Sequence, residues 1–186
     1  MLILSNTVIE EKELNERHRS PEFGESIFSA VSAGVFFLLI GAIFVYATFI
    51  QGVDLIGDII AFFRDFDLVV VPHTRRILFP APGHPGEHLS LYSTALQFSF
   101  VWGLYQIGVL ALRFVARSPL NKKAETASNI VFWFGTSYLV SIFLTKTALS
   151  ANATETWFVY WAAVIMLAGL SLVVRAIVLA VARLLQ

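Results

Sequence analysis

Residues Ser26–Val53 have the sequence SIFSAVSAGVFFLLIGAIFVYATFIQGV. It contains no Asp, Glu, Lys, Arg or His, and most of its residues are apolar. A helix needs about 20 largely apolar residues to cross the hydrocarbon core of a bilayer, because each residue advances it by about 1.5 Å. The stretch therefore predicts a transmembrane helix.

Three further uncharged runs follow, and each is long enough, or nearly so, to cross a bilayer. They are Leu89–Leu112, Thr126–Thr145 and Thr156–Val174. Beyond the last run the chain stays apolar except for Arg175 and Arg183, so we expect the fourth helix to continue past the membrane. Together the runs predict an all-α integral membrane protein, a bundle of four transmembrane helices.

The predicted organisation divides the chain into eight segments. They are a cytoplasmic N-terminal segment with a short helix at 1–25, the first transmembrane helix at 26–52, an outer amphipathic helix and Pro/His loop at 53–88, the second transmembrane helix at 89–113, a cytoplasmic loop at 114–125, the third transmembrane helix at 126–146, an outer loop at 147–156, and the fourth transmembrane helix with a cytoplasmic end at 157–186. The short N-terminal helix is expected at Val8–Arg19.

The composition disfavours several classes of protein. Only 14% of the residues are charged, whereas soluble domains carry about a quarter. The 13 basic and 13 acidic residues cancel, so no basic field for nucleic acid is expected. The chain has no cysteine, which excludes disulfides, thiolate metal ligands and cysteine nucleophiles. No catalytic signature is recognisable, so we predict neither an enzymatic activity nor a cofactor.

The distribution of Lys and Arg predicts the orientation in the membrane. Nine of the 13 lie in the N-terminal segment, the loop after the second run or the C-terminal end, and four lie on the opposite side. Cytoplasmic loops usually carry the excess of Lys and Arg. We therefore expect a multi-pass protein of the cell membrane with both termini in the cytoplasm.

The segment between the first two runs carries an acidic stripe. Asp54, Asp58 and Asp65 recur at helical spacing within Val53–Phe66, and apolar residues fill most of the other positions. This pattern predicts an amphipathic helix along the outer interface, with its acids facing water. In a ring of protomers the same acids would attract cations to a vestibule, whereas the simpler interpretation is a solvated polar face.

The region after this helix is rich in proline. We expect residues 67–72 to be extended, and Pro80, Pro82 and Pro85 predict a stiff connection rather than a helix.

The same region contains His73, His84, Glu87 and His88. Imidazoles and a carboxylate can together bind zinc or copper, so these four residues are a candidate metal site. Pro85 argues against a helix that would place two of the imidazoles on one face. The alternative is that they are ordinary polar loop residues near the lipid headgroups.

The four runs contain no ionisable side chain. Coupled transporters usually need an intramembrane carboxylate or a broken helix, and haem-binding bundles need histidines, so the sequence disfavours both. Gln97, Gln106 and Asn129 are the candidate polar residues within the membrane. They either line a wet path or form hydrogen bonds between helices.

Three functions fit these observations. The preferred hypothesis is the protomer of a homo-oligomeric channel or pore, which the acidic outer helix and the polar second run favour. The second is a non-catalytic accessory or structural subunit of a larger membrane complex, and the third is a membrane protein with a metal site on its outer face. The expected partners are the lipid bilayer and either further copies of the chain or other subunits.

Overall fold

A computed structural model of the chain describes residue 26 and residues 28–74, 76–146 and 153–184. The helix expected at Val8–Arg19 and most of the outer loop expected at 147–156 lie outside this part of the chain. The chain divides into two compact units, Met1–Leu38 and Leu39–Gln186.

Within the part of the chain that the structure describes, four helices are long and apolar enough to cross a membrane, as the four uncharged runs predict. They cover Phe28–Ile50, Pro85–Val115, Leu120–Thr145 and Ala153–Leu184. The first ends in a π-helical turn, η1, at Tyr46–Ile50. After it the backbone turns at Gly52, whose φ of 70° is a left-handed conformation that costs glycine little.

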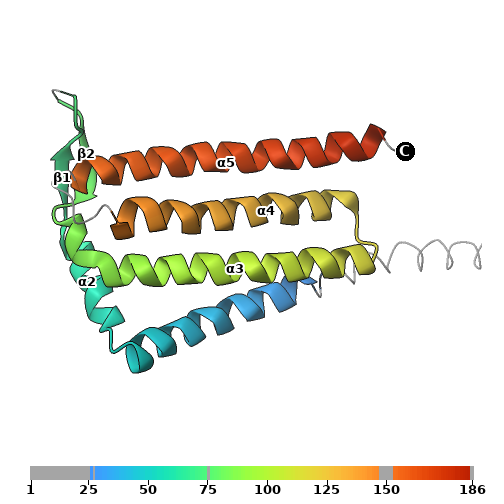
Figure 1. Cartoon of the computed structure of the whole chain (residues 1–186), viewed down its shortest axis with the longest axis horizontal. Coiled ribbons are helices and arrows are strands. Elements are labelled where there is room, and N and C mark those ends of the chain that lie inside the picture. Colours follow the sequence, from blue (N-terminus) through green and yellow to red (C-terminus); the bar gives the residue numbers. More distant parts are fainter. Residues whose placement is uncertain (1–25, 27, 75, 147–152, 185–186) are drawn as a thin grey trace, which may run out of the picture. The chain divides into compact units, whose positions relative to one another are not determined.

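Three of these helices lie side by side in the second unit (Figure 1). They are α3 (Leu89–Val115), α4 (Leu120–Leu139), which the π-helical η3 (Val140–Lys146) continues, and α5 (Ala153–Leu184). Helix α4 packs against both α3 and α5.

Glycines allow close packing on both sides of α4. A Cβ added at Gly103 of α3 would lie 3.1 Å from the ring of Phe134, and one at Gly135 of α4 would lie 2.4 Å from Leu167 of α5. Apolar side chains gain little by leaving lipid for a neighbouring helix. Close approach between helices is therefore a main source of stability in membranes.

Helix α4 begins at Leu120, not at residue 126 as predicted. The carbonyl of Pro119 accepts a hydrogen bond from the amide of Lys122 (3.0 Å), so the charged residues form the first turns of the helix. Arg117, with φ 51, ends α3 in the left-handed conformation common at helix C-termini. The loop between α3 and α4 is therefore shorter than the predicted loop 114–125. An uncharged run marks the part of a helix that can lie within the membrane, whereas the helix itself can begin earlier, at charged residues.

The segment before α3 forms a cap across one end of α3, α4 and α5 (Figure 1). We use "cap" for residues 54–88. It consists of the amphipathic helix α2 (Leu55–Arg64), the strands β1 (Phe66–Val70) and β2 (Leu78–Pro82), and the 3-10 helix η2 (Pro85–His88). The helix predicted within Val53–Phe66 is therefore confirmed.

Two features of the cap differ from the predictions. Strands β1 and β2 form an antiparallel hairpin that pairs Leu68 with Pro80 and Phe66 with Pro82, so the fold is helical with one hairpin rather than all-α. A two-stranded sheet has only edge strands, where proline is tolerated because its missing N–H can face away from the partner. Pro85 begins η2 instead of preventing a helix, because the first N–H of a helix has no partner to lose.

A cluster of buried apolar residues lies where the cap meets the helices. Phe62 of α2 lies edge-on to Tyr92 of α3 and Trp157 of α5, with ring centroids 6.2 Å and 6.0 Å apart. These aromatic contacts dock the cap on the ends of the helices. The core cluster consists of Ala81, Tyr92, Val140, Leu144, Trp157 and Tyr160.

Candidate functional site

Asp65 joins three elements of the cap. Its carboxylate accepts a hydrogen bond from the backbone amide of His84 (2.8 Å) and lies 2.9 Å from Nδ1 of His84 and 3.1 Å from Nε2 of His88. Its backbone carbonyl also accepts from the amide of Gly83 (2.8 Å). One residue thus ties the end of α2 to the end of β2 and the start of α3. We call Asp65, His84 and His88 the Asp65 cluster.

The local sequence explains how these groups meet. Asp65 is the residue that ends α2, with its amide bonded to the carbonyl of Ala61. A Cβ added at Gly83 would lie 3.2 Å from Oδ1 of Asp65, so the absence of a side chain at Gly83 lets the hairpin approach the carboxylate. The turn at Pro85 then brings His88 back to the same carboxylate.

The cluster extends from solvent into the core. The side chain of His84 is 70% exposed, that of Asp65 is 17% exposed and that of His88 is 6% exposed. Burial opposes ionisation of Asp65, but hydrogen bonds from His84 and His88 outweigh it and lower the pKa of the carboxyl. The hydrogen bond with Asp65, and the charges of Asp65 and Glu87, raise the pKa of His84. The pair is therefore favoured with both groups charged.

The two other acids of the predicted stripe also have structural partners. Asp54 is the N-cap of α2, where its side chain accepts a hydrogen bond from the amide of Gly57 (3.1 Å). This is the usual way in which an aspartate satisfies a free amide at the start of a helix. Asp58 accepts a hydrogen bond from the hydroxyl of Ser90 at the start of α3. Of the three carboxylates predicted to attract cations, Asp54 alone belongs to an exposed residue.

The four residues of the predicted metal site are not gathered into one site. The ring of His73 lies 3.4 Å from Glu155 of α5, and His84 and His88 meet different oxygens of Asp65. Glu87 acts on His84 through its charge. Among the residues that the structure describes, no three His, Asp or Glu side chains are arranged to hold a metal ion.

The polar residues predicted within the membrane differ in their surroundings. Gln106 is 8% exposed, whereas Gln97 and Asn129 are half-buried. Ser137 of α4 donates to the carbonyl of Leu96 in α3 (3.3 Å), and such a bond between helices is the predicted alternative to a wet path.

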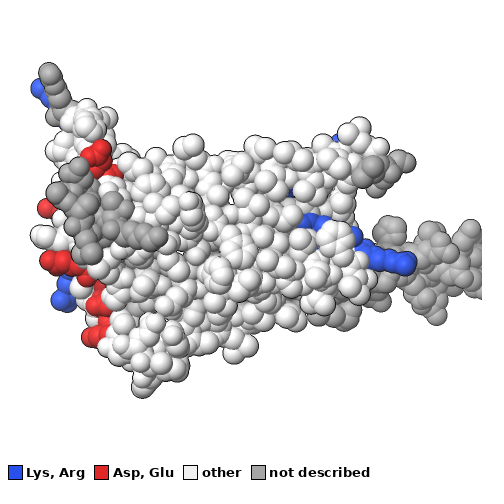
Figure 2. Space-filling view, viewed as in Figure 1, with Lys and Arg blue, Asp and Glu red and all other residues white. Residues whose placement is uncertain are grey.

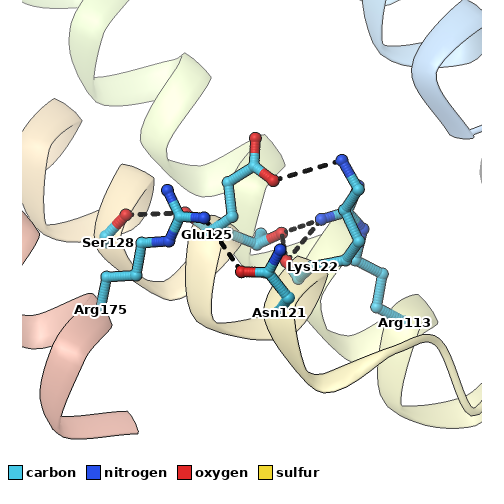
Figure 3. A network of polar contacts seen from close by, with 7 residues as sticks. Arg113, Asn121, Lys122, Glu125, Ser128 and Arg175 are labelled. Atoms are coloured by element: carbon cyan, nitrogen blue, oxygen red, sulfur yellow. Dashed lines mark hydrogen bonds and ion pairs between the residues drawn. The ribbon is translucent and has the colours of Figure 1, made fainter. Parts of the chain in front are cut away.

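A second polar network lies at the opposite end of the helices from the cap (Figure 3). Nη1 of Arg113 donates to the carbonyl of Lys122 (2.6 Å) and to the hydroxyl of Thr126 (2.5 Å), which holds α3 against the start of α4. Nη2 of Arg175 donates to Oδ1 of Asn121 (2.9 Å), which ties α5 to α4.

The described charges separate toward the two ends of the second unit, as Figure 2 shows for one face. Acids predominate at the cap end and bases at the other. The cap end has the acidic residues Asp54, Asp58, Asp65, Asp67, Glu87 and Glu155 and the basic residues Arg64 and Arg76. The opposite end has the basic residues Arg113, Arg117, Lys122, Lys123, Arg175 and Arg183 and the acidic residue Glu125.

The three members of the Asp65 cluster are all candidate residues in the sequence, but the sequence pattern places them in two different sites. Asp65 was grouped with the acidic stripe and the histidines with a metal site, because Asp65 lies 19 residues before His84 and 23 before His88. No local pattern links residues so far apart in a loop. Comparison of the chain with protein-family models, with curated proteins and with solved structures finds no match.

Proposed function

We propose that this chain is an accessory or structural subunit of a membrane assembly, held in the bilayer by its four helices. The observation that carries the proposal is that the ionisable side chains of the predicted sites form contacts within the fold. The stripe acids and both histidines of the Asp65 cluster form hydrogen bonds within the fold, while no residue in the most apolar part of α5 is buried within the protein.

Helix α5 supports this proposal through its lack of burial. No residue in its most apolar 18-residue window is buried within the protein, although the mean hydropathy there is 2.6. Ile165 and Met166 are 72% and 75% exposed. Such a surface can contact lipid or a helix of another subunit.

A groove between α4 and α5 is suited to a partner helix. Its volume is about 580 Å³, and its lining includes Gly135, Ala163, Leu167 and Leu170. Small residues beside larger apolar ones are typical of surfaces on which membrane helices pack. We propose that a transmembrane helix of another subunit occupies this groove.

The separation of charge supports an orientation for the subunit. Cytoplasmic ends of membrane proteins usually carry the excess of Lys and Arg. The end with Arg113, Lys122 and Arg175 is then cytoplasmic, and the cap faces the outside. This agrees with cytoplasmic termini, which the distribution of Lys and Arg also favours.

A homo-oligomeric pore is the second candidate, and the acidic cap end favours it. A ring of protomers would place several copies of Asp54 near one axis, where they would raise the local concentration of cations. The path would run between protomers, since the groove between α4 and α5 is lined almost wholly by apolar residues.

The native mass of the complex released from nanodiscs tests both functions. The structural role predicts other chains bound to this 20.7 kDa protein. Ala163→Trp fills the α4–α5 groove and should release them, whereas Ala176→Trp, on an exposed part of α5 outside the groove, should not. A 20.7 kDa monomer before any substitution would refute both proposals. A closed ring of identical chains would favour the pore, and its conductance should then fall in Asp54→Asn.

A further inference from the structure

A second apolar groove lies where the cap meets α5. Its volume is about 540 Å³. The hairpin contributes Phe66, Phe79 and Pro80 to its walls, and α5 contributes Trp161, Ala162 and Ile165. None of its lining residues is charged. Such walls offer water few hydrogen bonds, so an apolar occupant is favoured.

The groove extends along α5 over the depth of about one leaflet. Its lining on this helix runs from Trp157 to Ile165, which corresponds to about 12 Å of helix. The hydrocarbon layer of one leaflet is about 15 Å deep, half of the full core. Trp157 and Trp161 lie at the cap end, in keeping with the preference of tryptophan for the membrane interface.

The walls of the groove leave much apolar surface for an occupant to cover. Phe79 is 56% exposed, Trp161 is 47% exposed and Ile165 is 72% exposed. The groove joins the underside of the hairpin to the uncovered face of α5. A molecule in contact with the membrane-facing side of α5 at this depth would therefore also contact the hairpin.

The position of the hairpin favours a lipid over a protein helix. A transmembrane helix beside α5 must continue through the interface for the full depth of about 30 Å. Phe79 and Pro80 of β2, which belong to the cap, line the groove together with α5, so a helix seated in it would have to pass them to continue. A lipid chain ends at the interface and needs no passage beyond it.

We propose that this groove holds a hydrocarbon chain of a lipid from the leaflet on the cap side, clasped between β2 and α5. The occupant is thus defined by its chemistry, an acyl or isoprenoid chain. The proposal rests on the membrane placement above but not on the assembly role or on the α4–α5 groove.

Fluorescence quenching tests the site in the unmodified protein. The chain is reconstituted in nanodiscs with increasing fractions of phosphatidylcholine brominated on its acyl chains, and tryptophan emission is recorded. A bound chain predicts a quenching phase that saturates at a low fraction of brominated lipid. Trp161→Phe should weaken that phase and leave only the part from Trp157, which also lines the groove, whereas Trp102→Phe, at a buried position outside the groove, should keep it in full. Quenching that rises in proportion to the brominated fraction would show only surrounding lipid and overturn the proposal.

A groove-filling variant provides the second test. Ala162→Phe places a ring in the groove, and Ala176→Phe adds the same ring to an exposed part of α5 outside it. Native mass spectrometry should find one retained lipid per chain in the unmodified protein and in Ala176→Phe, and none in Ala162→Phe. Equal retention in all three proteins, or a protein chain released by Ala162→Phe in place of lipid, would refute the proposal. Loss of partners in Ala163→Trp, with the saturating phase intact, would separate this site from the assembly surface.

Discussion

Replacement of Asp65 by alanine is expected to loosen the cap while the helices keep their structure. The substitution removes the three hydrogen bonds between the Asp65 side chain and His84 and His88. His88 is 6% exposed, so its ring nitrogen would lose its carboxylate partner in a place that water reaches poorly. A buried polar group left without a partner costs about 1–3 kcal/mol. We therefore expect a loss of about 2 kcal/mol from His88 alone.

Hydrogen–deuterium exchange in nanodiscs measures this loss where it should occur. A change of about 2 kcal/mol alters an opening equilibrium about 30-fold. Amides of the hairpin, residues 66–82, should exchange faster by about that factor if they exchange through opening of the cap. Amides of α3 and α4 near Arg113 should keep their rates, because their hydrogen bonds lie at the other end of the helices.

Asp67→Ala is the matched control. It removes a carboxylate two residues away that is exposed and bonds to the neighbouring amide of Leu68 (2.7 Å). This variant should leave exchange in the rest of the hairpin nearly unchanged. Equal acceleration by Asp65→Ala and Asp67→Ala, or none by either, would refute the role given to the Asp65 cluster.

Three further predictions follow from the contacts described above. Because the pKa of His84 is raised from 6.5 and that of Asp65 is lowered from 3.8, their pairing should stabilise the cap fully between about pH 4 and 6.5. The exchange rate of the hairpin amides, corrected for its intrinsic pH dependence, should increase as the pH rises through the raised pKa of His84 and as it falls through the lowered pKa of Asp65. A His84→Gln variant that still shows the increase at high pH would contradict this. Gly57→Ala should fail to give the stabilisation of about 1 kcal/mol usual in a helix, because its Cβ would lie 2.3 Å from Oδ2 of Asp54 and displace the N-cap. In an Asp54→Ala background, where no N-cap side chain can be displaced, Gly57→Ala should stabilise α2 and slow the exchange of its amides. If Gly57→Ala does not slow exchange in that background, the steric explanation is refuted. Arg113→Met should destabilise the junction of α3 and α4 by about 2–3 kcal/mol through loss of the bonds to Lys122 and Thr126, seen as faster exchange at the start of α4. Arg117→Met is its control, because Arg117 is exposed. Equal acceleration of exchange by the two variants would count against those bonds.

The cap also shows where local sequence information ends. The acidic stripe correctly predicted α2, because helical spacing is a property of neighbouring residues. It did not indicate what Asp54, Asp58 and Asp65 contact, and each has a different partner. The prolines predicted a stiff connection, but the pairing of β1 with β2 gives some of them places in a strand.

The four helices of the described chain that can cross a membrane could be predicted from local sequence alone. A span depends on length and hydropathy within about 20 consecutive residues, and each run can be recognised without reference to the others. The tertiary structure alone decided the partners of Asp65, the burial of Gln106 and the groove between the hairpin and α5. These features join residues distant along the chain. They arise from how the hairpin and helices pack, and hydropathy within a single segment contains no information about that packing.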